Sequence, residues 1–185
     1  GDGQADQREL LYRGFGEGNQ QHRVNGFAWG LDNWLYVANG DSGGEIESAR
    51  TQLKLEINGR DLRIRPDSGA MEAQTGQTQF SRRRDDWGNW FSCSNPVALR
   101  HFVLADHYLR RNPHFAPPPV RRDIARSDNT QVFPLAEVIS HWSGYESPGA
   151  GDSHRFTSAA GISIYRDDLF GPEFDQNSFV CEPIH

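Results

Sequence analysis

Apolar and polar residues alternate in short runs along most of this chain, and turn residues separate the runs. Residues 19–44 show the pattern most clearly, with the runs Gly26–Gly30 and Trp34–Ala38 on either side of Leu31–Asp32–Asn33. Bulky side chains at alternating positions are typical of strands, and Asp-Asn favours a tight turn between them. We therefore predict a β-hairpin in this stretch.

Further runs repeat the order of strand, turn and strand. Thr51–Ile57 alternates, then comes Asn58–Gly59, a strong hairpin signal, and then the alternating run Leu62–Arg65 before a turn at Pro66–Gly69. Because no segment shows a sustained helical period, the sequence predicts an antiparallel all-β fold. We also expect strands at residues 8–15, 71–73, 99–104, 132–138, 159–165 and 178–181, a loop at 144–154, and a proline-interrupted segment without a regular helix at 106–122.

A faint internal repeat accompanies these strands. Gly26, Gly88 and Gly161 each stand near the start of an aromatic or alternating run, at separations of 62 and 73 residues. A propeller blade takes about 40–45 residues and more when its loops carry insertions. The repeat therefore predicts three blades of a β-propeller, at residues 7–75, 76–139 and 140–185.

Composition supports this class and excludes others. The chain has 36% hydrophobic residues, 19 Gly and 10 Pro, which is typical of short strands joined by many turns. Its net charge of −6 argues against a general nucleic-acid role, despite the local basic runs Arg82–Arg84 and Arg121–Arg122. The sequence contains no run of about 18 apolar residues, the length that would indicate a transmembrane helix.

The segment Arg82–Asp86 places five charges beside the aromatic residues Trp87, Trp90 and Phe91. One interpretation is a solvated charged face. The other is that some of these charges are partly buried and paired, or face a ligand, for which the planar guanidinium of arginine is well suited. The sequence leaves both open.

Polar residues flank the predicted hairpin at one end. His22 and Asn25 precede or begin its first strand, and Asp41 and Ser42 follow its second, so all four are expected at one rim. They are either functional or ordinary turn residues. At the N-terminus, Asp2 and Asp6 resemble the end of a calcium-binding loop, and a plain acidic turn is the alternative.

Longer motifs give the chain a family resemblance. The stretches QQHRVNGFAWGLDNWLYVANGDSGG, GRDLRIRPDSGAMEAQTGQTQFSRRRDDWGNWF, HYLRRNPH and SAAGISIYRDDLFGPEF resemble the propeller region of the large planctomycete-type proteins described as membrane-bound dehydrogenases. Those proteins often carry a haem c domain after the propeller. More distantly, the pattern is similar to the six-bladed soluble quinoprotein glucose/sorbosone dehydrogenases.

The wider group implies roles for several residues. His22, with Gly30 and Asp32 in step, stands where the group has its general base, and Arg84 stands in a motif similar to the one that holds pyrroloquinoline quinone. By the same resemblance, Asp41, Ser42 and Asn25 would lie at the cofactor side, and calcium would be a second cofactor. Ser42 replaces a quinone-contacting glutamine and Asp85 replaces an asparagine, so the quinone site departs from the pattern.

Two functions from different classes follow. The first is an exported sugar or alcohol dehydrogenase, in the periplasm or at the cell surface, that passes electrons to a quinone or to a haem c domain outside this chain. The second is a non-catalytic propeller that binds carbohydrate or acts as a scaffold; lactonase-like hydrolysis is a third possibility. We expect the chain to be part of a longer protein and, because export favours disulfides, we predict a Cys93–Cys181 bond.

Overall fold

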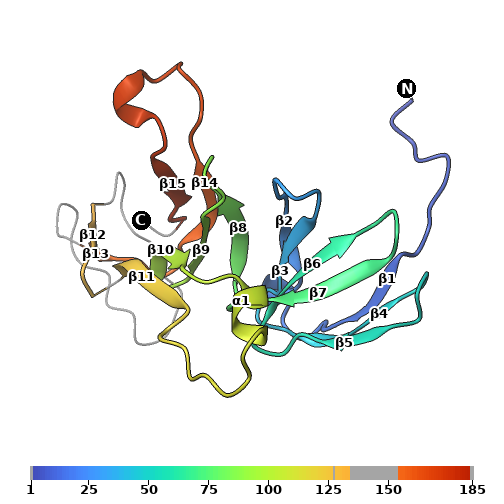
Figure 1. Ribbon diagram of the computed structural model, residues 1–185. Helices are drawn as coiled ribbons and strands as arrows, with labels where there is room; N and C mark the ends of the chain where they lie inside the picture. Colours follow the sequence, from blue (N-terminus) through green and yellow to red (C-terminus); the bar gives the residue numbers. More distant parts are fainter. Residues whose placement is uncertain (1, 127, 134–153, 184–185) are drawn as a thin grey trace.

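The computed structural model describes residues 2–126, 128–133 and 154–183, and strands dominate them (Figure 1). Every strand pair is antiparallel, so the expected antiparallel all-β class is confirmed. No helix in the described ranges is long and apolar enough to cross a membrane. The elements are β1 (Tyr12–Phe15), β2 (Asn25–Trp29), β3 (Leu35–Ala38), β4 (Gly44–Ser48), β5 (Lys54–Glu56), β6 (Asp61–Arg65), β7 (Ala70–Gln74), β8 (Phe80–Arg84), β9 (Trp90–Ser94), β10 (Val97–Phe102), α1 (Asp106–Arg110), β11 (Arg121–Arg126), β12 (Gln131–Val132), β13 (His154–Arg155), β14 (Ala160–Ile164) and β15 (Ser178–Cys181), with 3-10 helices at Gln20–His22 and Pro172–Phe174.

The predicted central hairpin forms one half of a four-stranded sheet with the order β2-β3-β6-β7. Its turn is closed by a 2.8 Å hydrogen bond from the Gly30 amide to the Trp34 carbonyl, and Asn33 adopts a φ of 60°. The predicted hairpin around residues 66–69 supplies β6 and β7. Both hairpins are confirmed, because their turn residues tolerate the backbone angles that the turns require.

The turn at Asn58–Gly59 forms but does not make a hairpin, so that prediction was wrong. The Arg60 amide donates to the Ile57 carbonyl at 2.9 Å, and Gly59 has a φ of 71°. However, β5 before the turn pairs with β4, whereas β6 after it pairs with β3 and β7. The turn therefore leads the chain from one sheet into another.

The sheet that the chain leaves at this turn has the order β1-β4-β5, and its strand β4 was not predicted from the sequence. Its only large apolar side chain, Ile46, is fully buried. Ile46 packs with residues from both sheets, and this cluster forms the main core. The buried members are Val37, Ile46, Ile57, Leu62 and Ile64.

A second four-stranded sheet, β8-β9-β10-β11, lies beside the first (Figure 1). Its first strand, β8, packs against β2 on one side and against β14 on the other. Contacts at both ends show that β2 and β8 run in the same direction: Asn25 bonds the Ser81 amide, and Arg84 bonds the Trp29 carbonyl. The first strands of successive sheets therefore lie side by side.

The strands β2, β8 and β14 share a backbone irregularity at their second residue. Gly26, Ser81 and Gly161 have φ angles of 63°, 62° and 66°, and the register with the neighbouring strand shifts at each. Gly88, by contrast, lies in the turn between β8 and β9. The three strands therefore share this bulge, and its middle member is Ser81 rather than Gly88. The sequence did not show this because a serine stands where a glycine was sought.

The segment 106–122 differs from the expectation of irregular chain. It begins with the helix α1 and ends in β11, an edge strand that pairs with β10. Its prolines fall between these two elements, where they interrupt neither. The strand predicted at residues 132–138 is described only at its start, and the loop 144–154 lies almost wholly outside the described residues.

A buried ion pair joins the two four-stranded sheets. Asp61 at the start of β6 is 0% exposed and accepts hydrogen bonds from Thr78 Oγ1 at 2.6 Å and from Arg82 Nη1 at 3.0 Å. Arg82, 2% exposed, lies with its guanidinium 4.3 Å from the centre of the Phe102 ring. Burial raises the pKa of Asp61 and lowers that of Arg82, and their mutual attraction opposes both changes. Of the two interpretations of the charged run, burial and pairing therefore holds for Arg82.

The two cysteines are free thiols, so the predicted disulfide was wrong. Cys93 is buried in β9 and its thiol donates to the Phe80 carbonyl at 2.9 Å, whereas Cys181 in β15 is exposed. The prediction rested on export to an oxidising compartment. Such a compartment permits a disulfide but does not bring two sulfur atoms into bonding geometry.

We expect an alkylating reagent to modify Cys181 but not Cys93 in the native protein. Burial raises the pKa of Cys93 to about 11, so its thiol is both inaccessible and protonated at mildly alkaline pH. Peptide mass mapping after iodoacetamide treatment measures this. A denatured sample, in which both thiols react, is the control, and equal labelling of both in the native protein would contradict the burial of Cys93.

Candidate functional site

The predicted polar residues before β2 and after β3 do lie at one end of the central hairpin. A Cβ atom placed on Gly40 would be only 2.0 Å from the Arg23 carbonyl oxygen, which shows how closely the two loops approach. Asn25 links this end to β8, because its amide donates to the Gln79 carbonyl at 2.8 Å and its oxygen accepts from the Ser81 amide at 2.8 Å. Asn25 therefore holds the two first strands together at this rim.

His22 ends the 3-10 helix Gln20–His22 and is half-buried. Its Nε2 atom lies 3.0 Å from Nε2 of Gln79, and the Gln79 oxygen accepts the Asn95 amide at 3.0 Å. Because that second bond fixes which end of the Gln79 amide is oxygen, the NH2 group must donate to His22. Nε2 of His22 is therefore the acceptor in this hydrogen bond.

Asp41 and Gln79 line a polar pocket of about 370 Å³ beside this histidine. Asp41 is exposed, has a φ of 73° and accepts a 2.7 Å hydrogen bond from Gln77 Nε2. Ser42 does not line the pocket and lies instead against Gly16, where an added Cβ would be 2.3 Å from the Ser42 carbonyl oxygen. The lining residues are Asp41, Gln77, Gln79, Ser94, Arg100 and Arg121.

Two arginines give the pocket donors that the sequence did not single out. Arg100 in β10 is nearly buried, and its Nε lies 2.5 Å from Asp123 Oδ1 in β11. Although burial raises the pKa of Asp123, the hydrogen bond and charge of Arg100 hold it below its usual value. Arg121 is exposed, and its side chain forms no hydrogen bond or ion pair with the part of the chain that the structure describes. Its guanidinium is therefore available to a ligand.

Arg84 does not belong to this rim. It ends β8, where its Nε donates to the Trp29 carbonyl at 3.1 Å and its Nη1 to the Asp85 carbonyl at 3.0 Å. Since β2 and β8 run in the same direction, Arg84 lies at the opposite end of these strands from His22. The Asp85 carboxylate caps its own turn through the Trp87 and Asn89 amides at 3.0 and 2.8 Å. The quinone-binding arrangement of the resembled group therefore does not fit these residues.

The acidic residues at the N-terminus form a local turn. Asp2 and Asp6 are exposed, and Asp2 Oδ1 accepts the Gln4 amide at 2.9 Å. Among residues 2–126, 128–133 and 154–183, no group of three or more His, Cys, Asp or Glu side chains could together hold a metal ion. Asp2 and Asp6 thus do not belong to a preformed calcium site.

Sequence reasoning placed His22, Asn25 and Asp41 at this end of the hairpin, and it did not single out the further lining residues Gln77, Gln79, Arg100 and Arg121. Gln77 and Gln79 lie in the loop between β7 and β8, and the two arginines come from β10 and β11. The basic run at 121–122 was considered in the sequence only as a possible sign of nucleic-acid binding. Its partners become evident only when the two sheets are packed together.

The fold and the rim define an all-β protein of packed antiparallel sheets with a polar pocket where strands of two sheets begin. Residues 1–185 match the family described as domain of unknown function DUF7133, and the chain belongs to this family. Comparisons with curated proteins and with solved structures found no match.

Proposed function

We propose that this chain is part of a β-propeller, with blades at residues 7–75, 76–139 and 140–185. Three features support this arrangement: the four-stranded antiparallel sheets, the side-by-side packing of β2, β8 and β14, and the bulge that these first strands share. In a propeller the first strands of the blades line a central channel. A six-bladed ring would need further blades from the longer protein or a partner.

We further propose that the rim carrying His22 binds a polyhydroxy ligand such as a sugar. The observation that carries this proposal is the 370 Å³ polar pocket, whose size suits a small molecule. Asp41 can accept hydrogen bonds from hydroxyl groups, and Gln77 and Arg121 can donate to them. Each hydroxyl of a polyol can both donate and accept a hydrogen bond, so a polyol can pair with these donors and acceptors together.

A second candidate function is the oxidation of a sugar or other alcohol, and the hydrogen bond in which His22 Nε2 is the acceptor favours it. A neutral imidazole with an unprotonated Nε2 at a ligand-binding rim can accept a hydroxyl proton. A quinone or a haem c domain outside this chain would be the electron acceptor, and the protein would work in the periplasm or at the cell surface. Because Gln79 occupies the Nε2 lone pair in this structure, binding is the better supported of the two functions.

The binding proposal predicts that Asp41→Asn weakens sugar affinity by about ten-fold, since one charge-assisted hydrogen bond to a hydroxyl is lost. Isothermal titration of the chain with glucose, galactose and glucuronate measures it. Asp67→Asn, which changes an exposed aspartate in the β6–β7 turn, is the matched control and should bind as the native protein does. If no sugar of the panel binds at millimolar concentration, or if both variants bind equally, the pocket is not the site.

The oxidation candidate is tested separately on the full-length protein supplied with calcium and pyrroloquinoline quinone. Dye-linked oxidation of the same sugars that is abolished in His22→Gln would support it. Sugar binding without turnover would leave the chain as a binding module.

A further inference from the structure

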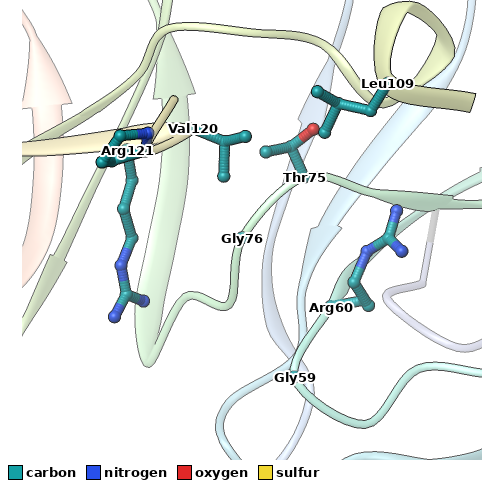
Figure 2. A pocket seen from close by; sticks show the side chains of 8 residues that line it. Gly59, Arg60, Thr75, Gly76, Leu109, Val120 and Arg121 are labelled. Carbon is teal, nitrogen blue, oxygen red and sulfur yellow. The ribbon is translucent and has the colours of Figure 1, made fainter. Parts of the chain in front are cut away.

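A second cavity, of about 430 Å³, shares Arg121 with the polar pocket, and Figure 2 shows the residues that line it. Its walls come from the turn before β6, the chain after β7, the helix α1 and the start of β11. It has apolar and polar parts. The lining residues are Gly59, Arg60, Thr75, Gly76, Leu109, Pro119, Val120 and Arg121.

The Thr75 hydroxyl is an unpaired polar group in this cavity. Thr75 is 2% exposed, and its Oγ1 atom has no hydrogen-bond partner among the described residues. Leaving a buried hydroxyl unpaired costs about 1–3 kcal/mol, so such a group calls for a partner. Figure 2 shows the oxygen facing toward Leu109, within the lined space.

Arg60 supplies a positive charge to the same cavity as the Thr75 hydroxyl. Its Nε donates to the Gln74 carbonyl at 3.1 Å and its Nη2 pairs with Asp106, while Nη1 has no partner among the described residues. Asp106 is shared with Arg110, whose Nε lies 2.7 Å from the second carboxylate oxygen. Two guanidinium groups therefore meet one buried carboxylate. Burial and the nearby charge of Arg110 lower the pKa of Arg60, which is the direction that an added anion would reverse.

The rest of the wall is apolar. Leu109, Pro119 and Val120 present hydrocarbon, and Figure 2 shows that the Arg121 guanidinium extends away from Thr75, past Gly76. Gly59 and Gly76 contribute only backbone to the lining. A ligand here would meet one cation and one hydroxyl at one end and hydrocarbon along the remainder.

We infer that this cavity binds a small monocarboxylate with an apolar body, whose carboxylate is held by Thr75 Oγ1 and Arg60 and whose hydrocarbon packs on Leu109, Pro119 and Val120. A hydroxyl and a guanidinium are both donors, which matches an acceptor-only carboxylate. The hydrocarbon wall favours an organic acid over inorganic phosphate. Phosphate has no apolar part to cover this wall, and it would lose its own hydration on entering the cavity. This site uses none of Asp41, Gln77 and Gln79 of the sugar pocket, although Arg121 lines both cavities.

Titration of the chain with benzoate, butyrate, benzyl alcohol and inorganic phosphate tests this. Benzoate and butyrate should bind at one molecule per chain. Benzyl alcohol, which keeps the ring and lacks the charge, and phosphate, which lacks the apolar body, should each bind at least about ten-fold more weakly.

The variants Thr75→Val and Thr75→Ser separate the hydroxyl from the shape of the residue. Thr75→Val should weaken benzoate binding by about ten-fold while the protein stays folded, since valine fills the same volume; Thr75→Ser should retain binding. Asp41→Asn should bind benzoate normally, because Asp41 does not line this cavity. No binding of either acid at millimolar concentration, equal binding of phosphate, or full binding by Thr75→Val would each overturn the inference, whatever the result with sugars.

Discussion

Replacing Arg82 by methionine is expected to lower the free energy of unfolding by about 3–5 kcal/mol, because the change leaves a buried carboxylate without its partner. Asp61 is 0% exposed and would keep its bonds from the Asn39 and Thr78 amides, at 3.1 and 2.9 Å, but lose the only guanidinium it contacts in the described chain. The methionine would also give up the contact with the Phe102 ring. Urea unfolding followed by tryptophan fluorescence measures the loss.

An exposed ion pair provides the matched control for this change. Arg50 Nη2 lies 3.0 Å from Glu9 Oε1 with both side chains largely in solvent, so Arg50→Met should alter stability by less than about 1 kcal/mol. In a double-mutant cycle, Asp61→Asn combined with Arg82→Met should cost less free energy of unfolding than the sum of the two single changes. The reason is that each single change leaves its charged partner buried and unpaired, whereas the double change removes both charges. Additive costs would show that the two side chains do not act as a pair.

The same pair explains why the two four-stranded sheets pack as one body. Asp61 belongs to the first sheet and Asn39 directly follows its strand β3, whereas Arg82 belongs to the second sheet and Thr78 to the loop that leads into it. A buried polar network is favourable only when its members meet in the correct geometry. We therefore expect the relative position of the sheets, and with it the polar pocket that both sheets line, to depend on this contact.

Local turn chemistry made part of the fold predictable from sequence. Asp32–Asn33 and Pro66–Gly69 occur where hairpins form, and the strand predicted at residues 178–181 matches β15. Asn58–Gly59 misled because the residues of a turn determine its backbone angles but not which strands pair on either side. The strand β4 was missed because one apolar residue, Ile46, is too weak a pattern by itself.

The candidate site also contains some residues that the sequence could predict and others that it could not. His22, Asn25 and Asp41 were predictable because the entry to the first strand of a hairpin and the exit from its second lie at one end. Arg84 was misplaced because the direction of β8 relative to β2 is set by packing between sheets, which no local pattern encodes. Arg100 and Arg121 reach the pocket from strands of the second sheet, so only the assembled structure shows them there.

Replacing Gly26 by alanine is expected to lower the free energy of unfolding by roughly 2–5 kcal/mol, from left-handed backbone strain and from overpacking. Gly26 has a φ of 63°, and a Cβ there would lie 2.4 Å from the Ser81 Cα of the next sheet. Because that atom is backbone, it can move away only if β2 and β8 separate. The change thus tests the packing of successive first strands on which the propeller proposal rests.

The equivalent positions of the repeat supply the controls. Gly161 has a φ of 66° but nothing within 4 Å of an added Cβ, so Gly161→Ala should lose only the strain term of about 1–2 kcal/mol. Ser81 carries a side chain at a φ of 62°, so Ser81→Gly should be neutral or stabilising by up to about 1 kcal/mol. Chemical denaturation of the three variants gives the order. If Gly26→Ala were no more costly than Gly161→Ala, β2 and β8 would not meet at this bulge, and the side-by-side first strands of a propeller would lose their main support.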